Sequence, residues 1–373
     1  MFPKYFLYRL IIALLIVSVS TGCESEDDTE SNPDAQLMYF PEIDSDQWET
    51  VSPESLSWDT SKLSSLYTYL EDNRTRGFIL IKNGRIVLEQ YWGNDILNTK
   101  PFDLNTNWYW ASAGKSLTAT LLGIAQQEGL LDINDKTSDY LGNGWTNLPL
   151  EKENLISIKN QLTMTTGLDY EIADLNCVDA PCLLYKQDAD NQWFYHNAPY
   201  TLLKNVVESA SNESYNAFTA NRLGSTIGLK GSWRQTGDNN VYWGSTRDMA
   251  RFGLLILNRG NWDGTAILND NNYFTQMTTP SQNLNPSYGY LWWLNGQDRI
   301  IYPGIATSFD TSLSEEAPSD LISAIGKNGQ FISVVPSENL VMIRVGEAPD
   351  DSLVPTIFHN ELWARVNVLL NKD

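Results

Sequence analysis

Apolar and polar positions form two separate groups of runs that predict strands near both ends of the folded chain. Residues 78–81 and 86–91 are apolar and β-branched and lie on either side of Asn83-Gly84. An Asn-Gly pair between such runs is a strong short-range signal for a hairpin. Strand character returns late in the chain, at residues 321–325, 331–335 and 340–345. Because both groups leave strand edges without partners, we expect them to join in one antiparallel sheet.

Helical spacing of apolar residues predicts the remaining elements. Residues 59–73 precede the first strands, residues 354–370 follow the last ones, and about 112–260 between them are mainly helical. The expected loops in this middle part are at 143–147, 167–181 and 231–240. We therefore predict an α+β fold, in which an antiparallel β-sheet is flanked by N- and C-terminal helices and carries an inserted, mainly helical lobe.

The first 22 residues have the pattern of an export signal. Lys4 and Arg9 precede an apolar run at residues 10–17, and small residues then lead to Cys23. This arrangement resembles a bacterial lipoprotein signal, which would leave Cys23 as the lipidated amino terminus. Ser20 departs from the pattern, because a leucine-like residue is usual there. An ordinary cleaved signal peptide and an anchor helix are the alternatives.

The segment after the signal is acidic. Residues 24–36 are rich in Glu, Asp and Ser and lack apolar periodicity, so we predict a solvated, disordered tether over residues 23–50. The folded domain is then expected over residues 51–373, which is long enough for a sizeable core. The chain is thus expected to be an exported lipoprotein of the bacterial cell envelope, with the membrane as a partner through Cys23.

Charge and composition exclude several partners. The chain has 25 Lys and Arg against 46 Asp and Glu, a net charge of −21, which disfavours nucleic acid. It has two histidines and no Cys-x-x-Cys, so we expect no metal site and no cofactor. With Cys23 assigned to the signal, Cys177 and Cys182 remain, and in an oxidising compartment we expect them to form a local disulfide.

The first candidate for chemistry lies where the helical middle begins. Ser112 and Lys115 are three residues apart, so a helix places them on one face. A serine hydroxyl becomes a nucleophile when a base takes its proton. Lysine is such a base only if burial or a nearby cation keeps it neutral near pH 7. Alone the pair is weak evidence, because a serine at a helix start is more often an N-cap.

Two later segments carry residues that would complete such a site. Tyr195 and Asn197 precede an amphipathic helix, where a phenol can relay a proton and an amide can orient Lys115 or a substrate carbonyl. Lys327 and Gly329 lie between two predicted strands and suit carboxylate binding or charge stabilisation. A buried loop tyrosine and an ordinary hairpin turn are the alternatives.

The small number of histidines limits which catalytic base a serine hydrolase could use here. The histidines are His196 and His359, and the chain contains no Gly-x-Ser-x-Gly. Both facts argue against a Ser-His-Asp hydrolase with a nucleophile elbow. We expect His359, on the closing helix, to be structural.

Ser-x-x-Lys, Tyr-x-Asn and Lys-x-Gly, in this order, resemble the serine β-lactamase and penicillin-binding superfamily. The details look most like its class C β-lactamase and esterase branch, and the resemblance covers about residues 55–370. Gly-x-x-Gly-Gln at 326–330 and Tyr170 after Thr-Gly-Leu-Asp look closest to the 6-aminohexanoate-dimer hydrolases. Further stretches that agree are Gly129–Asp132, Leu162–Leu168 and Ser245–Gly253.

The resemblance implies a role for each residue of the first two motifs. Ser112 would be the acylated nucleophile, Lys115 and Tyr195 the base and relay pair, and Asn197 the residue that orients Lys115. Burial and the field of Lys327 are expected to lower the pKa of Lys115, and neighbouring cations are expected to lower that of Tyr195.

The resemblance also implies an oxyanion hole, formed by the backbone N–H groups of Ser112 and Gln330. Tyr170 would contact the leaving group, with a packing role as the alternative. Lys327-Asn328-Gly329 departs from the Lys-Thr/Ser-Gly of β-lactamases, since the hydroxyl that would hold a lactam carboxylate is missing. This departure argues against strong β-lactamase activity.

These expectations describe a serine hydrolase that acts through an acyl-enzyme on ester or linear amide bonds of a small molecule. Its site would lie in the cleft between the sheet and the helical lobe. The acyl substrate stays open, because esters, linear amides and D-amino-acid peptides all fit the same groups. The alternatives are a catalytically silent, lipid-anchored binding protein for cell-wall or glycan ligands, and a D,D-peptidase or β-lactamase.

Overall fold

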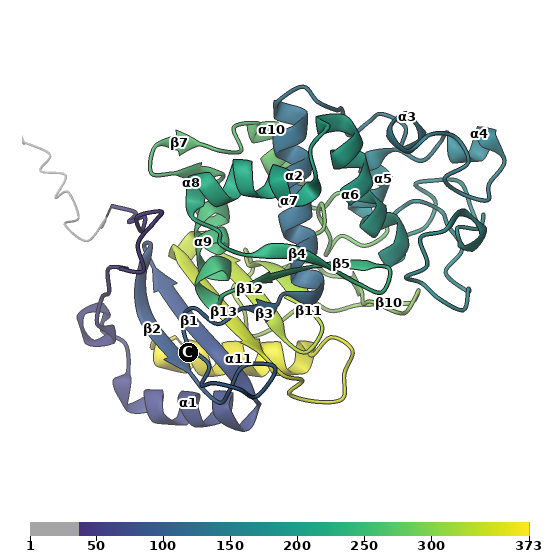
Figure 1. The fold of residues 1–373 in the computed structure, drawn as a ribbon. Coiled ribbons are helices and arrows are strands. Elements are labelled where there is room, and N and C mark those ends of the chain that lie inside the picture. The colour runs from purple at the N-terminus through teal and green to yellow at the C-terminus, as the bar shows by residue number, and fades with distance from the viewer. Residues whose placement is uncertain (1–36, 373) are drawn as a thin grey trace, which may run out of the picture. The chain divides into compact units, whose positions relative to one another are not determined.

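A six-stranded antiparallel sheet is the frame of the computed structural model, which describes residues 37–372 (Figure 1). The predicted hairpin and meander share this sheet, because β13 pairs with β1 along its length. The strands, in spatial order, are β2 (Arg85–Tyr91), β1 (Thr75–Lys82), β13 (Leu340–Gly346), β12 (Gln330–Val335), β11 (Ile322–Gly326) and β8 (Trp293–Leu294). The short β8 is the only one of them that the sequence pattern did not predict.

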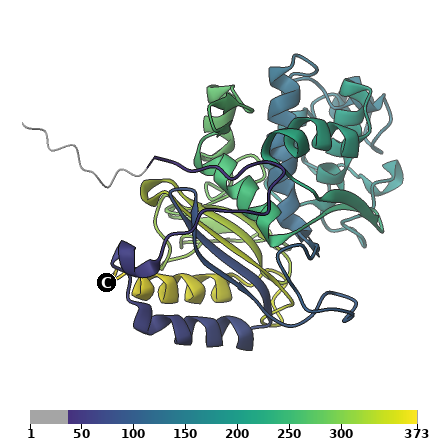
Figure 2. The same ribbon diagram turned by 60° about the vertical axis from the view of Figure 1, so that its left-hand side comes forward.

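Helices cover both faces of this sheet. The predicted terminal helices are α1 (Leu63–Asp72) and α11 (Thr356–Leu369), which lie side by side on one face (Figure 2). On the other face, α9 (Thr246–Leu257) packs against β12 and β13. A Cβ on Gly253 of α9 would lie 2.6 Å from Val341 Cγ1, so this glycine lets the helix approach the sheet closely.

The inserted lobe is mainly helical, as predicted (Figure 1). It places α2 at its centre, against both α6 and the sheet strand β11. Its helices up to α9 are α2 (Gly114–Gln127), α3 (Ser138–Leu141), α4 (Leu150–Glu153), α5 (Ile158–Thr163), α6 (Asn197–Ser211), α7 (Tyr215–Thr219) and α8 (Ser225–Ile227), and α10 (Asn271–Met277) follows.

The predicted loop at 231–240 is wrong. This segment forms β4 (Ser232–Thr236), which pairs with β5 (Asn239–Gly244), and β5 pairs in turn with β3 (Trp108–Tyr109). The cause is tertiary, because Trp233 is buried and its indole Nε1 donates to Thr219 Oγ1 at 3.0 Å. The side chain of Asn216 bonds both the backbone N–H and the carbonyl of Trp233. Two further pairs of short strands lie outside both sheets. They are β6 (Asn261–Trp262) with β7 (Thr265–Ala266), and β9 (Ile300–Ile301) with β10 (Ser308–Phe309).

The predicted tether over 23–50 extends too far. Residues 37–50 pack against the first hairpin: the Tyr39 N–H donates to Asn83 O, and Trp48 Nε1 donates to Gly84 O at 2.7 Å. A Cβ on Gly84, whose φ is 81°, would lie 1.9 Å from Tyr39 O. The folded domain therefore begins before residue 51, because a buried tryptophan anchors this segment.

The predicted signal over 1–22, the lipidated Cys23 and the acidic stretch to residue 36 lie outside the described residues, and they stay predictions. Within residues 37–372, no helix is both long and apolar enough to cross a membrane.

A buried arginine ties the sheet to the turn between β11 and β12. Arg344 on β13 is fully buried, and no carboxylate of the described residues forms a salt bridge with it. Its guanidinium donates instead to four backbone carbonyls, those of Asn73, Asn328, Gly329 and Glu347. Burial lowers the pKa of Arg344 to about 9, so the side chain remains charged at neutral pH.

We predict that Arg344→Leu destabilises the protein by about 3 kcal/mol, because it leaves several buried carbonyls without donors. The measurement is the free energy of unfolding from urea denaturation. Arg365→Leu, at a partly exposed position of α11, is the control. It should cost less than about 1 kcal/mol, because its ion pair with Glu361 is at the surface and leucine can still pack on the ring of Tyr69. Equal losses in the two variants would contradict the role assigned to Arg344.

Candidate active site

Ser112 lies on the 3₁₀ turn Ala111–Ala113, which leads directly into α2. Ala111 has a φ of 48°, in the left-handed region that residues with a side chain rarely adopt. Such strain, on the order of 1 kcal/mol, persists only where surrounding packing enforces it. Ser112 lies at the start of a helix, as predicted. It belongs to a strained turn before α2 and does not cap the helix.

Gly326, at the end of β11, holds the strand against this turn. A Cβ on Gly326 would lie 2.5 Å from Trp110 O and 3.0 Å from the backbone N of Ala113. Any side chain would therefore push the strand away from the nucleophile.

Lys115 reaches Ser112 as the helical spacing predicts. Its Nζ donates to Ser112 Oγ at 3.0 Å, and the side chain is 3% exposed. No carboxylate of residues 37–372 forms a salt bridge with it; its Nζ lies over the rings of Tyr195 and Tyr200, 4.9 and 4.3 Å from their centroids. Burial lowers the pKa of Lys115 to about 7. The direction agrees with the expectation, but burial alone causes it, without the expected field of Lys327.

Tyr195 is beside Lys115, but its ionisation differs from the expectation. Burial raises the pKa of Tyr195, and a hydrogen bond with Ser112 opposes this shift only in part. The ring stacks on Trp293 with centroids 5.8 Å apart and is 8% exposed. The expected lowering of its pKa is therefore wrong, because burial among aromatic side chains disfavours the charged phenolate more than the hydrogen bond with Ser112 favours it. Tyr195 is a neutral phenol near pH 7.

Asn197 begins α6, and its predicted contact with Lys115 is not formed. Its Nδ2 donates to Asn176 Oδ1 at 2.9 Å, and its own Oδ1 is buried without a hydrogen-bond partner in the described chain. Tyr200 follows one helical turn later, on the same face, and provides the second ring over Lys115. Tyr200 belongs to none of the three sequence motifs, although its spacing of three residues from Asn197 places both on one face of a helix.

Tyr170 has the packing role that was the alternative to leaving-group contact. Its ring stacks on Phe194, with centroids 4.2 Å apart and planes 10° apart, and Lys186 Nζ lies 4.2 Å from the ring centroid. It is not among the residues that line the cavity at Ser112. The implied contact with a leaving group has no support in this structure.

A cavity of about 360 Å³ opens at Ser112, between the sheet and the helical lobe. Lys115, Asn197 and Lys327 line it, so residues from all three motifs meet there as predicted. None of its lining residues, all within the described chain, is acidic. The full lining is Ala111, Ser112, Lys115, Asn176, Asn197, Tyr200, Thr236, Asn239, Asn240, Val241, Lys327 and Leu353.

The residues of the turn after β11 have different surroundings, and only Lys327 faces the cavity. Lys327 is exposed in the cavity. Gly329 has a φ of 78°, and a Cβ there would lie 2.7 Å from Arg344 Nη1, so this glycine makes room for the arginine and not for a substrate. Asn328 turns its side chain to the hydroxyl of Tyr109 at 2.7 Å.

The oxyanion role expected for Gln330 does not fit its position. Gln330 begins β12, which lies between β11 and β13, so its backbone groups face neighbouring strands. Its side chain is buried and bonds both the N–H and the carbonyl of Gly346. The mostly apolar run at 331–335 indicates a strand but does not indicate whether that strand lies inside the sheet or at its edge.

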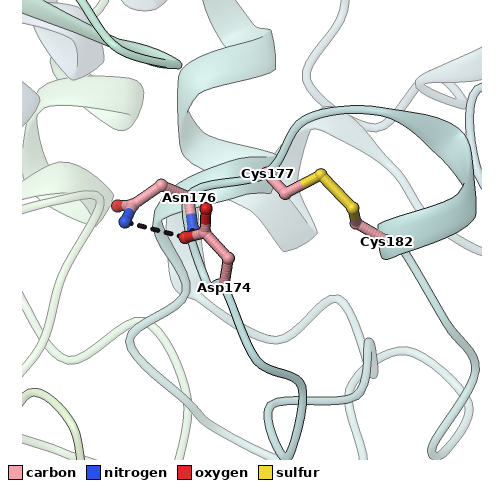
Figure 3. The surroundings of a disulfide bond; sticks show 4 residues. All are labelled: Asp174, Asn176, Cys177 and Cys182. Atoms are coloured by element: carbon pink, nitrogen blue, oxygen red, sulfur yellow. Dashed lines mark hydrogen bonds between the residues drawn. A yellow bond between two sulfur atoms is a disulfide. The ribbon is translucent and has the colours of Figure 1, made fainter.

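The remaining cysteine and histidine expectations hold. Cys177 and Cys182 form a disulfide (Figure 3). His359 is fully buried and contacts Ser333 Oγ at 3.0 Å, consistent with a structural role. Burial lowers the pKa of His196 to about 4, so this histidine does not titrate near neutral pH.

The fold and the Ser-x-x-Lys pair in its cleft define the class, a β-lactamase-fold serine hydrolase scaffold. The family model described as Beta-lactamase matches residues 69–350, and the chain belongs to this family.

Relatives and solved structures agree with this assignment. An uncharacterised protein of Alkalihalophilus pseudofirmus is 24% identical over 295 residues, which are 71% of this chain and 81% of that protein. A Bacillus anthracis structure named "Putative 6-aminohexanoate-dimer hydrolase" aligns with a TM-score of 0.65 and 16% identity, covering 90% of this chain and 91% of that one. A β-lactamase/D-alanine carboxypeptidase from Pseudomonas syringae aligns with a TM-score of 0.59 and 15% identity, over 84% and 98% of the two chains. These structural likenesses show the β-lactamase/transpeptidase-like fold.

We predict that kcat/KM for an ester substrate rises about tenfold per pH unit up to about pH 7 and then levels off, because only the neutral amine of Lys115 accepts a proton. Lys115→Ala should lower kcat/KM on the order of a hundredfold or more. The measurement is a pH–rate profile from pH 5 to 9. His196→Gln should leave the midpoint of the acid limb unchanged, and a limb that disappears in this variant would assign the proton transfer to histidine.

Proposed function

We propose that this chain is a serine hydrolase that cleaves carboxylic ester or linear amide bonds through an acyl-enzyme at Ser112. The observation that carries the proposal is the 3.0 Å hydrogen bond between Lys115 Nζ and Ser112 Oγ, in a setting that lowers the pKa of Lys115 to about 7. A buried lysine without an acidic partner is costly to keep charged. A binding module has no need of such a matched nucleophile and base.

The reaction follows from the positions of these groups. Lys115 Nζ takes the proton of Ser112 Oγ, which attacks the substrate carbonyl carbon and forms a tetrahedral intermediate. The leaving group then departs with a proton from the Lys115 ammonium, either directly or through the Tyr195 hydroxyl. Because the raised pKa keeps Tyr195 protonated, this phenol acts as a donor. A water molecule, deprotonated by the same amine, attacks the acyl carbon and releases the acid from Ser112.

The backbone N–H groups of Ser112 and Lys327 are the best candidates for the oxyanion hole. Gly326 pairs with Gln330, and Gly329 N–H donates to Gly326 O, so the backbone groups of Gly326 face β12. Successive residues of a strand direct their N–H groups to opposite sides. The N–H of Lys327 therefore faces away from β12, at the end of the strand that Gly326 holds against the Ser112 turn.

The charges of the cavity favour a substrate that carries a carboxylate. Within residues 37–372 its lining contains two lysines and four asparagines but no acidic residue, in a chain whose net charge is −21. Lys327 is exposed there and forms no salt bridge within the described chain. Because Asn328 is turned to Tyr109, no side-chain group of this turn replaces the hydroxyl of the β-lactamase motif. This supports linear esters and amides over β-lactams.

We predict that Ser112→Ala abolishes both ester hydrolysis and covalent labelling by a fluorophosphonate, while the melting temperature stays within a few degrees of the wild type. Ser64→Ala, at an exposed position near the start of α1, is the matched control and should keep full activity. Turnover that persists in Ser112→Ala would refute the nucleophile. Absence of turnover and labelling in the wild type, together with tight ligand binding, would favour the binding protein.

We further predict that Lys327→Met raises KM roughly three- to tenfold for an ester with a free carboxylate, because an exposed charge contact contributes about 1 kcal/mol. The substitution keeps the backbone N–H, so kcat should change little. The KM for a neutral ester should stay the same. Comparison of KM at low and high salt measures the charge contribution. Lys136→Met, at an exposed site away from the cavity, is the control. An equal loss for neutral and anionic esters would rule out a role in carboxylate binding.

A further inference from the structure

Asn176 joins the disulfide-bonded loop to the cavity. It directly precedes Cys177 in the chain (Figure 3). It is also one of the residues that line the cavity at Ser112. The segment that delivers it has little regular structure of its own, apart from the 3₁₀ turn Ala180–Cys182.

The hydrogen bonds of Asn176 determine which way its amide points. Its Nδ2 and its backbone N–H both donate to Asp174 Oδ1, at 3.0 and 2.9 Å. An ionised carboxylate only accepts hydrogen bonds, so the side-chain nitrogen must be the end that faces Asp174. The oxygen of Asn176 is therefore directed to the opposite side, toward the cavity wall.

The oxygen of Asn176 connects two further segments. Its Oδ1 accepts from Asn197 Nδ2 at 2.9 Å and from Asn239 Nδ2 at 3.2 Å. Asn197 starts α6, two residues after Tyr195, and Asn239 starts β5 on the other wall. One amide thus links the loop, the start of the helix that follows Tyr195, and the strand pair. All three asparagines line the cavity.

The disulfide fixes the loop at the point where Asn176 leaves it. Cys177 and Cys182 are five positions apart, so the bond closes a small ring that limits the loop locally. Few other backbone bonds hold the segment; Leu175 O accepts from the Ala198 N–H at 3.0 Å, and Asp179 O from the Cys182 N–H at 2.9 Å. Without the ring, these few hydrogen bonds alone would have to offset the conformational entropy lost when Asn176 is held in place.

We propose that Asn176 is a positioning residue that sets the acyl preference of the cavity, and that the Cys177–Cys182 bond holds it in place. It acts by fixing Asn197 and Asn239 relative to each other, so the width of the cavity depends on it while the Ser112–Lys115 pair does not. This inference rests on the proposed hydrolase function and deepens it. Loss of Asn176 should change which substrates bind and leave the nucleophile reactive.

The test compares p-nitrophenyl acetate with p-nitrophenyl hexanoate, two neutral esters that differ in acyl length. In Asn176→Ala, the ratio of kcat/KM for the two esters should change about tenfold, mainly through KM, because a lost hydrogen-bond network weakens binding by about that factor. Labelling of Ser112 by a small fluorophosphonate should change less than about threefold. Asn143→Ala, an exposed asparagine of the same lobe, is the matched control.

Two further variants separate positioning from general damage. Asp174→Asn combined with Asn176→Asp reverses the donor and acceptor but leaves an oxygen that accepts from Asn197 and Asn239, so it should restore the wild-type ratio. The added carboxylate raises the pKa of Lys115 and lowers the rates for both neutral esters alike, so this effect cancels in the ratio. Cys177→Ser with Cys182→Ser should shift the ratio in the same direction as Asn176→Ala.

An unchanged ratio in Asn176→Ala, with Ser112 still labelled, would overturn the inference and leave the hydrolase assignment standing. A shifted ratio in Asn176→Ala but not in the double cysteine variant would overturn the role of the disulfide. If wild-type Ser112 is not labelled at all, the proposed function itself fails, and the inference fails with it.

Discussion

The burial of one ammonium group is the constraint on which the rest of this site depends. Lys115 has no acidic partner in the described chain, and its Nζ contacts the hydroxyl of Ser112 and the rings of Tyr195 and Tyr200. A carboxylate at this place would hold the lysine in its charged form and remove the base. The chain has 46 acidic residues, yet none of those within residues 37–372 lines the cavity, so the negative charge of the described part lies away from Lys115.

The frame around Lys115 is built from contacts that tolerate little change. Gly326 brings β11 against the turn of Ser112, and Arg344 holds the carbonyls of the turn that carries Lys327. On the opposite wall, Asn176 joins the disulfide loop to α6 and β5. In each case a polar or small residue of the interior positions an irregular segment, and regular helices and strands supply the rigid support.

The elements and the family were accessible from the sequence because they rest on local patterns. Apolar periodicity predicted α1, α11, the mainly helical middle and the two strand groups, and an Asn-Gly pair located the first hairpin. Helical spacing placed Lys115 beside Ser112, and the nearness of Cys177 to Cys182 indicated their bond. These features depend on residues a few positions apart, so the chain itself determines them.

Tertiary structure alone decided the features that join distant segments. The pKa of Tyr195 rises because residues far along the chain, such as Trp293, bury it, and no local pattern reports that loss of hydration. Gln330 lost its expected role because β12 lies inside the sheet, and Asn197 turned to Asn176 rather than to Lys115. Burial and hydrogen-bond choice are set by the whole packing around a group, whereas sequence spacing determines only which neighbours are near along the chain.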